Sequence, residues 1–61
     1  MAIDHDVARA ARNLITEHGK AAESIALARA KHAEESNRDA VALTWRKIAA
    51  AVRRLQGRPD R

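Results

Sequence analysis

Apolar positions recur at helical spacing along most of this chain, and most clearly between Asp39 and Gln56. At about 100° per residue, the larger apolar residues of this stretch fall within a sector of roughly 80°. They are Val41, Trp45, Ile48, Val52 and Leu55. The basic residues of the same stretch point elsewhere. The pattern therefore predicts an amphipathic helix that buries an apolar stripe and presents a basic side to water.

A first helix is predicted over residues 6–18. Asp4 or Asp6 suits its N-cap, and Ile3 suits a staple position just outside the first turn. Gly19 follows as a C′ residue that takes the left-handed conformation, so we expect a tight turn there. The predicted apolar face of this helix consists of Val7, Ala10, Ala11, Leu14 and His18.

A second helix is predicted over residues 20–35, which are rich in alanine and contain no proline or glycine. Its most apolar face also carries Arg29 and His32. Leu27 and Ala30 lie on another side, so the helix is expected to have neighbours on two sides. The apolar face itself is formed by Ala22, Ile25, Ala26 and Ala33.

The second and third helices, over 20–35 and 39–56, are predicted to be separated by a turn. One straight helix would place the stripe that holds Trp45 about 120° or more away from the alanine face of the second helix. A turn at residues 36–38 removes that conflict. Ser36 and Asp39 have capping-box spacing, and Asn37 is an alternative cap. Residues 57–61 follow the third helix and are predicted to form a frayed tail.

Composition predicts one small all-α domain over residues 1–61, built from two to three short helices. Of the 28 apolar residues, 15 are alanine, which favours helix but contributes little burial. A chain of this size is only marginally stable on its own. We therefore expect it to complete a helical bundle by homodimerisation.

The net charge of +4 is concentrated in the last third of the chain. Two interpretations remain open. The cations near the end of the third helix are favoured there by the helix dipole and keep the surface soluble. Alternatively, they bind nucleic acid, and salt would then weaken that binding strongly. The candidate contacts are Arg46, Lys47, Arg53 and Arg54.

Several other functions are not indicated by the sequence. The absence of cysteine excludes disulfides and thiol chemistry. The longest apolar run, from Ala49 to Val52, is far shorter than the roughly 20 residues of a membrane span, and the charged N-terminus does not resemble a secretion signal. No catalytic spacing or phosphate-binding loop is present. His32 and Glu35 form only a single i, i+3 pair, which does not indicate a metal site. Taken together, these absences predict a cytoplasmic, non-enzymatic protein with no metal or cofactor.

Three polar or aromatic residues stand out as interaction candidates. His18, at the end of the first helix, is placed to cap a carbonyl. Arg29 lies in an alanine face, so we expect it to stack on Trp45 or to meet Glu17, Asp39 or a partner chain. Either these residues hold the helices in register, or Arg29 and Trp45 form a hot spot for another chain. The predicted interaction or structural set is completed by Ile48, Val52 and Leu55.

Two strings of residues carry a resemblance to a known group. The first is Ala11-x-x-Leu14-Ile15-x-x-His18-Gly19-x-x-Ala22-x-x-x-Ala26-x-x-Arg29-Ala30. The second is Trp45-x-x-Ile48 followed by Ala51-Val52-x-x-Leu55-Gln56. Together they resemble a group of uncharacterised small helical proteins common in alphaproteobacteria. That group implies a bacterial, cytoplasmic, non-membrane protein and implies no activity. Its members often carry Gly-Asp before the third helix, where this chain has Ser36-Asn37-Arg38-Asp39.

Overall fold

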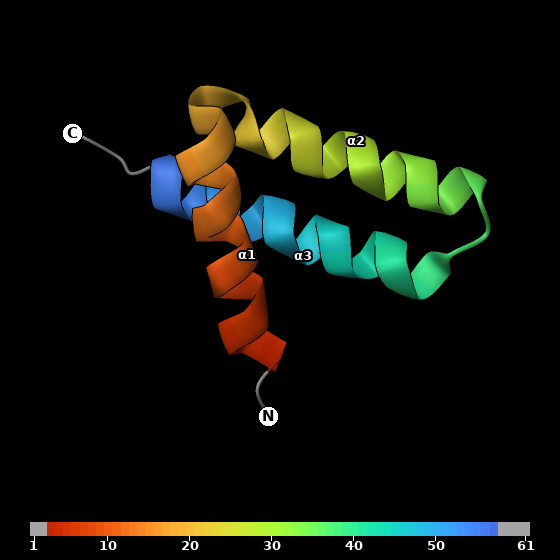
Figure 1. The fold of residues 1–61 in the computed structure, drawn as a ribbon. Helices are drawn as coiled ribbons and strands as arrows, with labels where there is room; N and C mark the ends of the chain where they lie inside the picture. Colours follow the sequence, from red (N-terminus) through yellow and green to blue (C-terminus); the bar gives the residue numbers. More distant parts are fainter. Residues whose placement is uncertain (1–2, 58–61) are drawn as a thin grey trace.

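The computed structural model describes residues 3–57 of the chain, with side chains from residue 6 onward. The elements, in order, are α1 (Ile3–His18), a 3-10 turn η1 (Gly19–Ala21), α2 (Ala22–Glu35) and α3 (Asp39–Gln56) (Figure 1). The predicted all-α fold is therefore confirmed. The predicted turn between the second and third helices is also present, so α2 and α3 are separate helices.

α2 and α3 form an antiparallel hairpin whose two helices lie side by side along their length (Figure 1). Alanines occupy the facing sides of both helices, and their small side chains allow the two backbones to approach closely. The spacing between packed helices depends on the side chains at the contact, so this interface is narrow. The buried alanines of the hairpin are Ala22, Ala26, Ala30, Ala33, Ala42 and Ala49.

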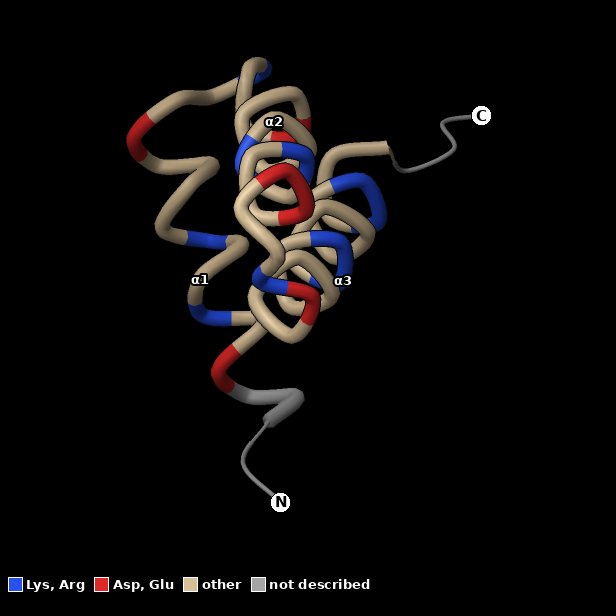
Figure 2. Tube along the Cα trace, turned by 90° about the vertical axis from the view of Figure 1, so that its right-hand side faces the viewer, with Lys and Arg blue, Asp and Glu red and all other residues tan. Residues whose placement is uncertain are grey.

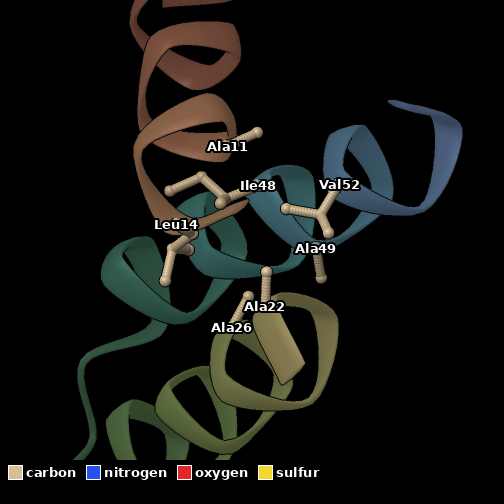
Figure 3. Close-up of a cluster of buried hydrophobic side chains, with 7 residues drawn as sticks. All are labelled: Ala11, Leu14, Ala22, Ala26, Ile48, Ala49 and Val52. Carbon is tan, nitrogen blue, oxygen red and sulfur yellow. The ribbon is translucent and has the colours of Figure 1, made fainter. Parts of the chain in front are cut away.

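α1 crosses this hairpin near its open end, where it packs mainly on α3 and less on α2 (Figure 1). Ala11 and Leu14 of α1 meet Ile48 and Val52 of α3 in the core, above the alanines of the hairpin (Figure 3). Val52 is the largest fully buried side chain among the described residues. The core is therefore small, and much of it consists of methyl groups.

The molecule is more extended than a compact domain of its size. Its principal extents are 39 × 27 × 20 Å, and its radius of gyration is 11.5 Å, against about 10.5 Å for a compact chain of this length. Its accessible surface is 4749 Å², against roughly 3,900 Å² for a folded monomer of this mass. A single copy thus leaves more surface exposed than is usual.

The turn between α1 and α2 depends on Gly19. Its φ of +58° lies in the left-handed region, as predicted for a C′ glycine. The side-chain amide of Gln56 donates a hydrogen bond to the Gly19 carbonyl oxygen at 2.8 Å. Because Gln56 is the last residue of α3, this bond ties the end of the hairpin to the turn that positions α1.

The turn between α2 and α3 begins with a Schellman motif at the end of α2. Asn37 has a φ of +60°, and its N–H donates to the Glu34 carbonyl at 3.0 Å. The N–H of Arg38 donates to the Ala33 carbonyl at 2.8 Å. These bonds satisfy carbonyl groups that the last turn of a helix otherwise leaves unpaired, with asparagine in the position that glycine usually takes.

The prediction of a capping box at Ser36 and Asp39 is wrong. The N-cap of α3 is Arg38, and it makes no side-chain capping hydrogen bond. Asn37 is not an N-cap either, because its backbone conformation belongs to the end of α2. Asp39 lies in the first turn of α3, where a negative charge is favoured by the helix dipole.

The start of α1 also differs from its prediction, because the helix begins at Ile3 rather than at residue 6. Asp4 and Asp6 therefore lie within the helix and not at its N-cap position. The proposed staple side chain of Ile3 lies outside the described side chains. Of the predicted tail, Gly57 is described and follows α3 directly, whereas residues 58–61 lie outside the described residues.

Candidate interaction surfaces

Arg29 and Trp45 contact each other across the hairpin. The guanidinium carbon of Arg29 lies 5.2 Å from the centroid of the Trp45 ring system, within the range of cation–π attraction. This confirms the expected stacking on Trp45 among the alternatives considered for Arg29. Both residues line a hollow of about 410 Å³ near the turn between α2 and α3. Trp45 is half-buried and lies at the edge of the core rather than inside it.

The predicted stripe on α3 is buried at its centre and exposed at its ends. Ile48 and Val52 are buried beneath α1. Val41 and Leu55 stay 43% and 46% exposed. The reason is that α1 crosses α3 over a short segment instead of running along it (Figure 1). The sequence pattern identified the correct face of α3 but could not show how much of that face α1 covers.

His18 is exposed, and its Nε2 atom lies 3.8 Å from the Oε1 atom of Glu17. The carbonyl oxygen of Gly19 at this turn accepts from the side-chain amide of Gln56 and from the backbone N–H of Ala22. Sequence analysis missed Gln56 because its partner lies 37 positions away along the chain. Only the packing of α3 against the first turn brings the two together.

The four basic residues predicted as nucleic-acid contacts lie on two sides of α3. Arg46 forms an ion pair with Glu34 of α2, and Arg53 lies on that same side of α3. Lys47 faces α1, and Arg54 lies at the boundary between the two sides. Figure 2 shows basic and acidic segments interspersed along α1, α2 and α3. The four cations therefore do not form one uniformly positive surface.

A groove runs between α1 and α3, with a volume of about 690 Å³. We call it the basic groove. Its charged side chains are Arg12 from α1 and Lys47 and Arg54 from α3. Its apolar lining consists of Val7, Ala8, Ala50, Ala51 and Leu55. Sequence analysis did not select Arg12, because its position on the polar side of α1 gave no sign that it would face α3.

The opposite side of the hairpin carries two exposed leucines. Leu27 and Leu43 are 48% and 55% exposed. Leu27 lies two turns before Glu34 on α2 and lines a hollow with Arg46 and Arg53. Leu43 lies about 60° from Arg46 around α3, so both leucines border the side that carries the Glu34–Arg46 ion pair. We call this side the open face. Its residues are Glu23, Leu27, Glu34, Leu43, Arg46 and Arg53.

The open face lies away from α1. Arg46 and Ile48 are separated by about 200° around α3, and Ile48 is the residue that packs against α1. Leu27 was expected to meet a neighbour on a second side of its helix. In the described part of the chain, that side of α2 faces solvent.

The described residues give no indication of a metal centre or a membrane span. Within them, no group of three or more histidine, cysteine, aspartate and glutamate side chains is placed to hold a metal ion. None of the helices in residues 3–57 combines the length and the apolar character needed to cross a bilayer.

Comparisons with protein-family models, with curated proteins and with solved structures find no match to this chain. The resemblance to small alphaproteobacterial helical proteins therefore stays a prediction from the sequence.

Proposed function

We propose that this chain is a non-enzymatic helical interaction module that works in the cytoplasm as a homodimer. One observation carries the proposal: the open face exposes Leu27 and Leu43 by about half. The chain has only 13 apolar residues larger than alanine, so leaving two leucines in water forgoes a large part of its burial. Each leucine would contribute roughly 1 kcal/mol if a partner covered its exposed half.

The charges of the open face favour a second copy of the chain as the partner. Glu23 and Glu34 supply two negative charges, and Arg46 and Arg53 supply two positive ones. A twofold axis that runs along this face between α2 and α3 lays α2 of one copy on α3 of the other, so acids of one copy lie opposite bases of its partner. Such complementarity sets the orientation of the two copies and avoids like-charge contacts.

The size of the open face predicts a weak dimer. α3 has 18 residues and is roughly 27 Å long at 1.5 Å per residue, so two adjacent helices present on the order of 500 Å². Two such faces bury about 1,000 Å² in total, at the lower end of specific interfaces. We therefore expect dissociation in the micromolar range.

Sedimentation equilibrium over a concentration series tests the dimer. The wild type should approach twice its mass of 6.7 kDa as concentration rises. Replacing both open-face leucines, Leu27→Asp with Leu43→Asp, should give the mass of one chain with unchanged helicity. The matched control is Ala28→Asp with Thr44→Asp, which adds the same charge at exposed positions outside the open face and should leave the dimer intact.

A wild type that keeps the mass of one chain at about 200 µM, well above a micromolar dissociation constant, contradicts the proposal. Equal dissociation of the leucine and control variants would show that added charge, rather than loss of the leucines, separates the copies.

The competing proposal is nucleic-acid binding by α3. It is supported by the presence of Lys47 and Arg54 in one groove with Arg12. It is weakened by the pairing of Arg46 with Glu34, because part of the predicted basic surface is neutralised within the chain. A gel shift across a salt series tests it: binding at low salt that charge reversal of Arg53 and Arg54 abolishes would favour this alternative.

A further inference from the structure

The basic groove carries an inference about the class of partner. We propose that it binds an acidic amphipathic helix presented by another protein. The proposal rests on the interaction function proposed above and names a partner for it. Arg12, Lys47 and Arg54 supply positive charge around the groove, and no acidic side chain lines it among the described residues. The remaining lining is aliphatic, so the groove combines the two properties that such a helix requires.

The length of the groove fits about two turns of a guest helix. Its lining residues on α3 begin at Lys47 and end at Leu55, in the i, i+3, i+4, i+7, i+8 pattern of one helix face. That face is roughly 12 Å long at 1.5 Å per residue. α1 borders this face where it crosses α3, through Val7, Ala8 and Arg12. A guest helix lying along this face of α3 would place apolar side chains one turn apart on it, as in helix-in-groove complexes.

The cations of the groove make no ion pair with another described side chain. Among the described side chains, the ion pairs are Arg46 with Glu34 and His18 with Glu17. Neither pair includes Arg12, Lys47 or Arg54. Cations at the rim of an apolar groove attract acidic ligands and fix their orientation, while the floor supplies burial. The ligand should therefore carry carboxylates on both sides of its apolar face.

The shape and lining of the groove favour a helix over nucleic acid. Single-stranded nucleic acid binds largely by stacking its bases on aromatic side chains. The only aromatic residue of the chain is Trp45, which lies outside the groove and stacks on Arg29. Ala8, Ala50 and Ala51 keep the groove shallow and aliphatic, which suits leucine or isoleucine side chains.

A second copy of the chain is a poorer occupant of the groove. Each copy carries a net charge of +4, so it is repelled by the cations of the groove. The open face, by contrast, balances its charges. The two surfaces meet at Arg54, so each is tested with variants away from that boundary, at Arg12 on α1 for the groove and at Leu27 on α2 for the open face.

Fluorescence anisotropy with a labelled synthetic peptide tests the proposal. The probe is a helix of about four turns with leucines along one face and glutamates on the other. A scrambled peptide of the same composition keeps the charge but disperses the leucines. The amphipathic probe should bind at least about tenfold more tightly than the scrambled one, since only the former can occupy the apolar floor.

Charge reversal in the groove locates the site. Arg12→Glu and Lys47→Glu should each weaken peptide binding at least about tenfold, because each places an acid beside the glutamates of the probe. The matched control is Arg9→Glu, which makes the same change on α1 at an exposed position outside the groove. It should leave the affinity within about twofold of wild type.

Three outcomes would overturn the proposal. These are equal binding of the scrambled peptide, equal loss in the Arg9→Glu control, and displacement of the probe by unlabelled DNA at lower concentration than by unlabelled peptide. The third outcome would assign the groove to nucleic acid. Sedimentation of Arg12→Glu separates this test from the dimer proposal, because that variant should lose the peptide and keep the mass of the dimer.

Discussion

The two sides of α3 carry similar residues in opposite environments. Ile48 is 5% exposed and Leu43 is 55% exposed, although both are large aliphatic residues on one helix. Ile48 meets Leu14 of α1, whereas Leu43 is not part of the core cluster and stays largely exposed to solvent. The position of α1, rather than the hydrophobicity of each residue, therefore decides which side forms the intrachain core and which side stays exposed.

The largest expected effect is a difference in stability between truncations on these two sides of α3. Ile48→Ala should lower the free energy of unfolding by about 2–5 kcal/mol, which would leave a domain of this size mostly unfolded. Leu43→Ala should change it by less than about 0.5 kcal/mol when measured well below the dimer dissociation constant. Urea unfolding followed by circular dichroism measures both. Equal losses in the two variants would show that the open face is part of the monomer core.

The next effect concerns the turn that places α1 over one side only. Gly19→Ala should destabilise the chain by about 1 kcal/mol, because alanine resists the left-handed conformation. An added Cβ meets nothing within 4 Å, so backbone strain alone causes the loss. Asn37→Gly, at the turn of the hairpin, should change stability in the opposite direction by a few tenths of a kcal/mol. Thermal melts of both variants test this, and a shift of the same sign in both would contradict it.

The contact between Arg29 and Trp45 should contribute less than either the core or the Gly19 turn. Arg29→Met keeps an unbranched apolar stem but removes the charge above the ring, and should cost about 0.5–1 kcal/mol. The indole emission of Trp45 should shift as well, since no other aromatic residue contributes. Unchanged emission and unchanged stability together would show that the two side chains do not stay in contact in solution.

The smallest expected effect is at Ser36. In a capping box, Ser36→Ala would cost about 1 kcal/mol. The structure instead begins α3 at an Arg38 N-cap without a side-chain hydrogen bond, so we expect less than about 0.3 kcal/mol, as for an ordinary surface site. A denaturant midpoint within experimental error of wild type supports the Schellman turn. A loss of stability near 1 kcal/mol would instead indicate that Ser36 caps α3 in a capping box.

Local patterns in the sequence were sufficient to predict the helices. Apolar periodicity placed all three, although α2 begins at Ala22 after a 3-10 turn rather than at residue 20. The phase difference between the second and third required the turn that the structure contains. Gly19 was identified because left-handed backbone strongly favours glycine. Arg29 was expected to need a partner such as Trp45, because an unpaired guanidinium on an alanine face is unfavourable.

The arrangement of the helices could not be predicted in the same way. Alanine faces pack at many crossing angles, so nothing in the sequence specified that α1 would cross the end of α3. The basic groove and the exposure of Leu43 both follow from that crossing. Arg12 was therefore missed as a site residue. At the hairpin turn, Asn37 suited both an N-cap and a left-handed C′ position, and only the backbone hydrogen bonds distinguish them.

Isotope-filtered NMR on a mixture of labelled and unlabelled chains tests the central claim most directly. At concentrations that favour the dimer, we predict intermolecular contacts from the methyl groups of Leu27 and Leu43, and none from Ile48 or Val52. Intermolecular contacts from Ile48 or Val52 would mean that the core is shared between copies. The absence of any intermolecular contact would show that the open face does not bind a second copy.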